Sequence, residues 1–277
     1  MRIIGIDFTS VPGRQKPITC LPCILEGGIL RTEPMRPLVS FAEFESALAE
    51  PGPWICGIDF PFGLPRRFLE NAGWPTDWRA YVEFALGLGK SGFVSALEAY
   101  KAPRKKGDKE HLRRTDRLVG SLSPQKLDRV PVAKMFFEGA PRLVRAGVCI
   151  PHVLEGDRSR IVVEAYPGAL ARNMVGRASY KGDRRDERAN RRLKVRVEMF
   201  EKIVGDDLYD SFGFRVEAMR TIVEDPLGDC LDALLAAMQA AWAWGLRERG
   251  FGAPADVDTA EGWIAHPIVL AGTTRFA

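Results

Sequence analysis

Three separate stretches of the chain end a run of strand-forming residues with an acidic side chain. Gly5-Ile6-Asp7-Phe8 and Gly57-Ile58-Asp59-Phe60 are nearly identical, and Ile161-Val162-Val163-Glu164 repeats the pattern with Glu. Carboxylates gathered at the edge of a core lose hydration and repel one another, so a pKa must rise unless a cation compensates their charge. Each acid taken singly also fits a turn after a strand. The three together favour a site for a divalent cation.

A further acidic pair is predicted on the last strong helix, which starts after Pro226. Asp229 and Asp232 are three residues apart and share one face in its first turns. The neighbouring face carries a long apolar stripe: Leu231, Leu234, Leu235, Met238, Ala241 and Trp242. We expect the stripe to pack on a sheet, so that Asp229 or Asp232 points toward Asp7 and Asp59.

Positive charge is concentrated in two segments, although the net charge is only +4. Residues 101–129 carry ten Lys or Arg against four acids, and residues 172–196 carry ten against three. Clustered cations of this kind favour a polyanionic partner such as DNA or RNA. Solvated helix faces, 184–196 especially, explain the same pattern equally well. The candidate phosphate contacts are Arg104, Lys105, Lys106, Arg113, Arg114 and Lys181.

Size and composition indicate an ordinary globular protein. The chain has 277 residues, of which 46% are hydrophobic and 27% charged, enough for one domain with a sizeable core. An acid at position 7 comes too early for the apolar region of a signal peptide, and no stretch approaches the ~20 apolar residues of a membrane span. Five scattered cysteines argue against a disulfide framework. We therefore expect a cytoplasmic protein that does not contact a membrane.

The spacing of apolar residues predicts an α/β fold in one domain. Strands are expected at 2–8, 18–25, 28–32, 54–60 and 160–165, with helices at 40–50, 167–175, 186–204 and after Pro226. The first three strands should form a meander. The fourth should lie parallel to the first, because a helix connects the two. Residues from about 66 to 158 look like a largely helical, basic insertion.

These residues resemble a known superfamily. The order of elements, with Asp7 ending the first strand, Asp59 the fourth and Asp232 on the last helix, is similar to that of the ribonuclease H-like nucleases, resolvases and integrases. More closely, the chain resembles domain of unknown function 429, a family of predicted nucleases. The motifs that carry this closer resemblance are Gly5-Ile6-Asp7-Phe8-Thr9, residues 57–65 around Asp59, Glu164-Ala165-Tyr166-Pro167-Gly168-Ala169, and Glu261-Gly262-Trp263-Ile264.

The resemblance implies a ribonuclease H-like mixed five-stranded sheet flanked by helices, and catalytic acids at Asp7, Asp59 and Asp232. Asp229 competes with Asp232, and Glu164 fits the closer family's pattern. It implies hydrolysis of phosphodiester bonds in DNA or RNA by two Mg²⁺ or Mn²⁺ ions, hard cations that prefer oxygen ligands. Asp7 would bridge both ions, Asp59 would hold the leaving-group ion, and Asp232 or Asp229 the ion that carries the attacking water. Glu164 would hold a metal-bound water or lie just outside the site.

Two other functions fit parts of the sequence. In a noncatalytic module that binds nucleic acid, the basic segments would make the contacts, and the acids would be remnants or a structural metal site. A nucleotide-dependent phosphotransferase of the actin and sugar-kinase type is suggested by residues 5–10, which resemble the first phosphate loop of that group. That loop is poor in glycine, however, and lacks the backbone cradle that phosphate binding favours.

Overall fold

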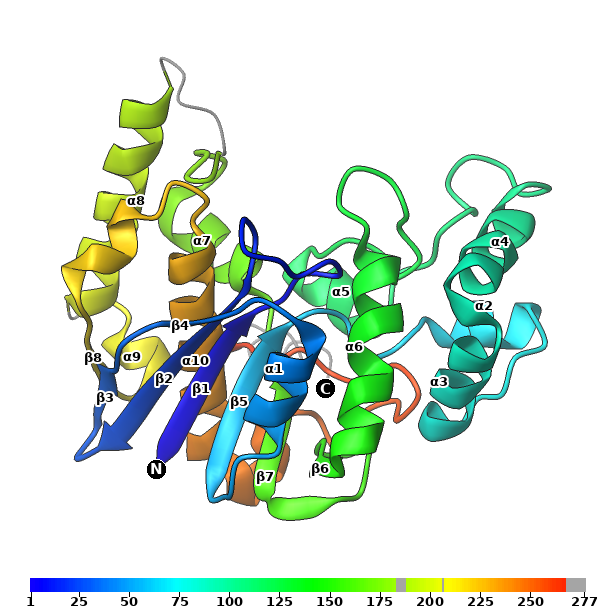
Figure 1. Cartoon of the computed structure of the whole chain (residues 1–277), viewed down its shortest axis with the longest axis horizontal. Coiled ribbons are helices and arrows are strands. Elements are labelled where there is room, and N and C mark those ends of the chain that lie inside the picture. Colours follow the sequence, from blue (N-terminus) through cyan, green and yellow to red (C-terminus); the bar gives the residue numbers. More distant parts are fainter. Residues whose placement is uncertain (183–187, 206, 268–277) are drawn as a thin grey trace.

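One twisted sheet organises the molecule, with helices on both of its faces (Figure 1). The computed structural model describes residues 1–182, 188–205 and 207–267. The strands lie in the order β6-β7-β5-β1-β2-β3-β8, and β4 pairs with β2. The predicted meander is β1 (Arg2–Asp7), β2 (Ile18–Glu26) and β3 (Ile29–Thr32), with antiparallel pairing throughout. The expected α/β class with a mixed sheet is confirmed.

The parallel strands have the predicted neighbours. β5 (Trp54–Asp59) pairs with β1 in a register that sets Gly5 opposite Gly57 and Asp7 opposite Asp59. β7 (Asp157–Glu164) pairs with the other edge of β5 and aligns Ile58 with Glu164. Because parallel strands end at the same edge of the sheet, the acids that end β1 and β5 are adjacent.

The predicted number of five strands is wrong, since the described residues form a sheet of eight. The additional strands are very short: β4 (Arg36–Leu38), β6 (Val148–Cys149) and β8 (Arg215–Glu217). Two or three residues are too few to show an alternating pattern in the sequence. β7 also begins three residues before the predicted position, because its first residues are polar and exposed.

One face of the sheet is covered by α10 (Asp229–Gly245), α7 (Pro167–Val175) and α8 (Ala189–Val204). Figure 1 shows the orange α10 directly behind β1 and β2. α10 begins three residues after Pro226, as predicted, and its middle is buried on all sides. The first residues of the helix predicted at 186–204 lie partly outside the described residues. Residues 209–224 add α9 (Tyr209–Phe212), β8 and a 3-10 turn (Arg220–Glu224) at the edge of the sheet.

The opposite face packs against α1 (Phe41–Leu48) and α6 (Val132–Ala146), whose Phe44 and Phe136 are buried there. Ser40 accepts a hydrogen bond from the backbone N–H of Glu43 and so caps the start of α1, at the beginning of the helix predicted at 40–50. Beyond α6 lie α2 (Arg66–Asn71), α3 (Trp78–Gly87) and α4 (Gly89–Lys101), whereas α5 (Arg114–Val119) lies between α6 and α7 (Figure 1). All four belong to the region predicted as a helical insertion. Among the described residues, no helix is both long and apolar enough to span a membrane.

Candidate metal centre

Three carboxylates from distant parts of the sequence meet at one edge of the sheet. Asp7 ends β1, Asp59 ends β5, and Asp232 lies in the first turn of α10. One oxygen of each lies within 4.8 Å of the others. Asp7 and Asp232 are buried, and Asp59 is half-buried. This group, which we call the acidic triad, is close enough to hold a divalent cation with hard oxygen ligands.

Alternation along the two strands explains why both aspartates point toward α10. In β1, Ile4 and Ile6 pack into the core on the α1 side, whereas Ile3 packs on the α10 side. Gly5 and Asp7 have the parity of Ile3, and the same rule puts Gly57 and Asp59 on the α10 face of β5. Each strand therefore presents a glycine followed by an aspartate to the same helix.

The two glycines let α10 approach the sheet closely. A Cβ atom on Gly5 would lie 1.9 Å from the carbonyl oxygen of Ala233, and one on Gly57 would lie 2.3 Å from that of Ala236. Glycine inside a strand is explained by this kind of contact. The contact brings the first turn of α10 within reach of both strand ends.

Burial and mutual repulsion disfavour the charged form of the triad. Burial raises the pKa of Asp7 well above its usual range, and the charges of Asp232, Asp229 and Asp59 act in the same direction. Burial and the charge of Asp232 raise the pKa of Asp59 to about 7. The start of α10 partly offsets this cost, because the positive end of a helix dipole favours acids in the first turn.

Lys181 supplies positive charge to the acidic triad from within the chain. Its Nζ contacts the Oδ2 atom of Asp232, and the Tyr180 hydroxyl donates a 2.7 Å hydrogen bond to Oδ1 of the same carboxylate. Burial opposes the charged form of Lys181, yet the carboxylates of Asp232 and Asp7 raise its pKa above the usual value. Lys181 was predicted as a phosphate contact, and its side chain is 40% exposed beside the acids.

The backbone around Tyr180 and Lys181 is fixed by a buried arginine. Arg196 of α8 donates to the Tyr180 carbonyl at 2.9 Å and to the Val223 carbonyl at 2.7 Å. Gly228, just before α10, packs against both Tyr180 and Lys181. Sequence reasoning assigned no role to Tyr180 or Arg196. Arg196 belongs to the segment interpreted as basic surface, and only the fold turns its side chain inward.

Glu164 does not belong to the acidic triad. It is aligned with Ile58, which packs on the α1 side, so its side chain leaves the opposite face of the sheet from Asp7 and Asp59. There both of its carboxylate oxygens accept hydrogen bonds from Arg113, at 2.6 and 2.7 Å. Its predicted place, on a metal-bound water or just outside the metal site, is therefore corrected to the other side of the sheet.

Arg113 is also corrected from a surface cation to an internal one. Its side chain is 1% exposed and binds Asp116, the Glu261 carbonyl and Glu164. All five of its N–H donors are used in these bonds. It is therefore not available to hold the backbone of a nucleic acid, and it ties α5 to the end of β7 instead.

The remaining predicted residues lie around the site in different settings. Asp229 is buried and its charge raises the pKa of Asp7, but it is not part of the group that fits one ion. Arg104 lies over the ring of Tyr100, with its guanidinium carbon 3.8 Å from the ring centre, and Lys105 is exposed. Arg114 is exposed and pairs with Asp256.

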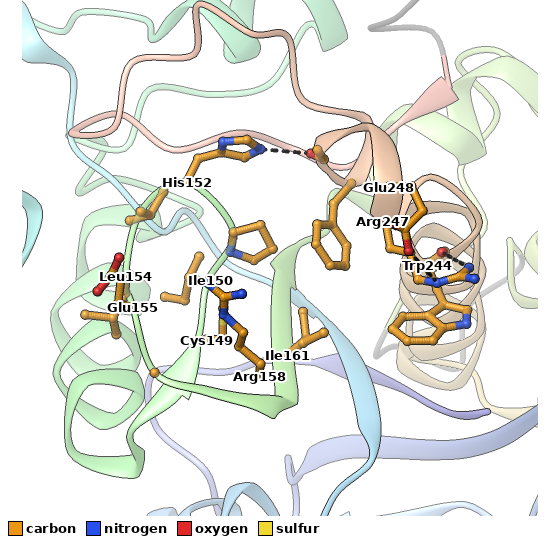
Figure 2. A pocket seen from close by; sticks show the side chains of 15 residues that line it. Cys149, Ile150, His152, Leu154, Glu155, Arg158, Ile161, Trp244, Arg247 and Glu248 are labelled. Carbon is orange, nitrogen blue, oxygen red and sulfur yellow. Dashed lines mark hydrogen bonds and ion pairs between the residues drawn. The ribbon is translucent and has the colours of Figure 1, made fainter.

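A cavity of about 630 Å³ lies away from the acidic triad (Figure 2). It is lined by the start of β7 and the end of α10, including Cys149, Arg158 and Trp244, whereas the triad lies at the start of α10. Figure 2 shows His152 directed toward the chain at Gly250, whose carbonyl lies 3.0 Å from Nε2. No carboxylate of the triad lines this cavity.

Comparisons of the chain with protein-family models, curated proteins and solved structures find no match. The family resemblance therefore stays a prediction, and function has to be inferred from the geometry of the site.

Proposed function

We propose that this protein hydrolyses phosphodiester bonds in nucleic acid with the help of divalent metal ions bound at the acidic triad. One observation carries the proposal: Asp7, Asp59 and Asp232 converge to within 4.8 Å from two strand ends and a helix start. We also propose that the fold is ribonuclease H-like. The order β3-β2-β1-β5-β7 and the parallel pairing of β1, β5 and β7 support this assignment.

The donor set fits Mg²⁺ or Mn²⁺. Three carboxylates provide only oxygen ligands, which hard divalent cations prefer, and the site needs no histidine. Burying these carboxylates in charged form without a bound metal ion is costly, as the raised pKa values of Asp7 and Asp59 indicate. When bound, such ions activate water and stabilise the charge that develops on a phosphate. Two ions, as proposed, need more ligands than three carboxylates provide. Asp229 would supply a further carboxylate.

The chain's own residues would prepare the site and hold the substrate. Asp7 and Asp59 are fixed by their strands, and Tyr180 orients Asp232 through its hydrogen bond. The Lys181 ammonium, 40% exposed beside the acids, is positioned to attract a phosphate oxygen. The two basic segments, in their described parts, add the long-range attraction that a polyanion would feel.

The phosphotransferase alternative has no observation in its favour. Gly5 would be the glycine of its phosphate loop, but the space a Cβ would need there is filled by the backbone of α10 at Ala233. The glycine therefore serves helix packing rather than a phosphate cradle. The noncatalytic module differs from our proposal only in turnover, so the same experiment separates the two.

The proposal is tested by incubating the purified protein with labelled single-stranded, duplex and branched DNA and RNA in Mg²⁺ or Mn²⁺. We expect cleavage that stops with a chelator and falls by at least about a hundredfold in Asp7→Asn, because loss of even an outer partner of a metal site costs tenfold to a hundredfold. The exposed Asp256→Asn serves as the control and should cleave normally. Cleavage that survives Asp7→Asn would contradict the proposal. Salt-sensitive binding without any turnover would favour the noncatalytic module.

A further inference from the structure

A smaller cavity, of about 220 Å³, opens directly beside Asp59 of the acidic triad. Phe60 and Pro61, which follow Asp59, form one wall, and Met135 of α6 and Tyr166 contribute others. Leu122 and Val130 complete it from the loop between α5 and α6. Apolar and aromatic side chains thus surround much of a space that Asp59, a residue of the acidic triad, also lines.

The mouth of this cavity exposes apolar side chains to solvent. Leu122 is 43% exposed and Val130 is 50% exposed, although both are large and aliphatic. Single exposed apolar residues are common, but these two flank one cavity beside Asp59, so that a ligand in the cavity would contact both. A flat apolar group entering the cavity would remove both side chains from water.

Polar groups in the cavity wall are already engaged. Arg113 uses all five of its N–H donors on Asp116, Glu164 and the Glu261 carbonyl. Ser121 donates to Oδ1 of Asp116 at 2.6 Å. A ligand in this space would therefore be held mainly through the faces of its rings and only weakly through hydrogen bonds at its edges.

The two basic segments meet next to the same cavity. Arg172, from residues 172–196, donates to the carbonyls of Val119 and Gly120 at 2.6 and 3.0 Å, and both belong to residues 101–129. The Arg172 guanidinium also lies 5.3 Å from the ring centre of Tyr166, which lines the cavity. An aromatic group in the cavity would thus lie near the positive charge of Arg172 and near Asp59 of the acidic triad.

We propose, building on the function inferred above, that this cavity receives one unstacked nucleobase of the strand whose phosphate is hydrolysed at the triad. Its volume lies below the roughly 300–1,000 Å³ of pockets for drug-sized ligands, which suits a single ring system. A base can enter only when it is free of its complementary strand. The substrate class is therefore single-stranded or locally unpaired nucleic acid. Because the cavity contacts the faces of a base more than its hydrogen-bonding edges, the preference among the four bases is weak.

The test uses a labelled single-stranded oligonucleotide in which one base at a time is replaced by an abasic residue. We expect kcat/KM in Mn²⁺ to fall about tenfold at one position near the cleaved bond, because stacking on protein side chains contributes strongly to single-strand binding. The double variant Leu122→Ser and Val130→Ser should lower cleavage of the intact strand by a similar factor and abolish the abasic effect. Leu86→Ser is the matched control, since Leu86 is 42% exposed on α3 and does not line the cavity; it should behave as the unchanged protein.

Binding of the same strands, followed by fluorescence anisotropy and by a 2-aminopurine base at the critical position, separates the two proposals. Cleavage that is equally fast at every abasic position, in both the unchanged protein and the double variant, would overturn the base pocket and leave the hydrolase intact. A 2-aminopurine signal that is lost only in the double variant, without any cleavage, would support the pocket and overturn the hydrolase. Neither binding nor cleavage of any strand would overturn both.

Discussion

Lys181 and the acidic triad show how one residue can substitute for a counterion. The lysine contacts Asp232, and its charge lowers the cost of the negative charges on Asp7 and Asp59. An ion that binds all three carboxylates has to compete with this contact. The same side chain that stabilises the metal-free carboxylates therefore weakens their affinity for metal.

Replacing Lys181 should separate these two effects. In Lys181→Gln, we expect the metal-free protein to unfold a few degrees lower, because the carboxylates lose their internal cation. The affinity for Mn²⁺ should rise several-fold, since a positive charge leaves the site. Thermal unfolding with a chelator and calorimetric titration with Mn²⁺ measure the two effects. The exposed Lys105→Gln should change neither, and a lower Mn²⁺ affinity in Lys181→Gln would contradict the competition between lysine and metal.

The raised pKa of Asp59, about 7, predicts how the cost of its charge depends on pH. A carboxyl group whose pKa is higher in the folded than in the unfolded state binds more protons when folded. Its charge therefore lowers the free energy of unfolding by the full amount above pH 7. This loss of stability disappears as the pH falls toward 4. Asp7, whose pKa is also raised, acts with the same sign.

Asp59→Asn isolates this effect from other titrations, among them that of His266, whose pKa burial lowers to about 4. Without metal, we expect Asp59→Asn to unfold a few degrees above the unchanged protein at pH 8, and this advantage to shrink to less than about half at pH 5. Thermal unfolding at both pH values measures the difference. An advantage of the variant that is as large at pH 5 as at pH 8 would show that the charge of Asp59 is not its cause.

At the scale of elements, the contact of α10 with β1 and β5 decides where the acids meet. Gly5 and Gly57 lie on the face that α10 covers, and each is followed two residues later by an aspartate on the same face. The sequence predicts this contact well, because a glycine inside a buried strand often marks the close approach of another backbone. The pairing of β1 with β5 was also predictable, from the helix that connects them.

Glu164 shows what the sequence could not establish. The three acids end similar apolar runs, and nothing in the runs themselves fixes which side chains face α10. The pairing of Ile58 with Glu164 gives Glu164 the opposite parity, so it meets Arg113 across the sheet. A shift of one residue in register moves a side chain to the other face. Alternation places Glu164 only once the structure shows Ile161 and Val163 packed on the α10 side.

Enlarging Gly5 tests the contact between α10 and β1. In Gly5→Ala, the added Cβ would collide with the backbone of Ala233, so we expect a loss of stability of about 3 kcal/mol and weaker Mn²⁺ binding as Asp232 moves away. Gly13→Ala is the matched control, because nothing lies within 4 Å of the added atom. Denaturant unfolding and Mn²⁺ titration provide the readouts. Equal stability of the two variants would show that α10 does not approach β1 as described.

At the scale of the whole molecule, the sheet separates two groups of buried charged side chains. On the α10 face, the strand ends and α10 collect Asp7, Asp59 and Asp232, with Lys181 as their cation. On the other face, Arg113, Asp116 and Glu164 form a buried cluster that holds the helical region 66–146 to β7. Basic composition alone did not distinguish internal cations such as Arg113 and Arg196 from surface ones, because only the fold determines which are buried.

Calorimetric titration of the metal-free protein with Mn²⁺ at pH 8, where the triad is most fully charged, tests the proposed metal centre most directly. We expect binding by the unchanged protein and by Asp256→Asn, and its loss in each of Asp7→Asn, Asp59→Asn and Asp232→Asn while all three remain folded. Undiminished Mn²⁺ binding by these three variants, or no binding by the unchanged protein, would contradict the claim that the three aspartates form one metal centre.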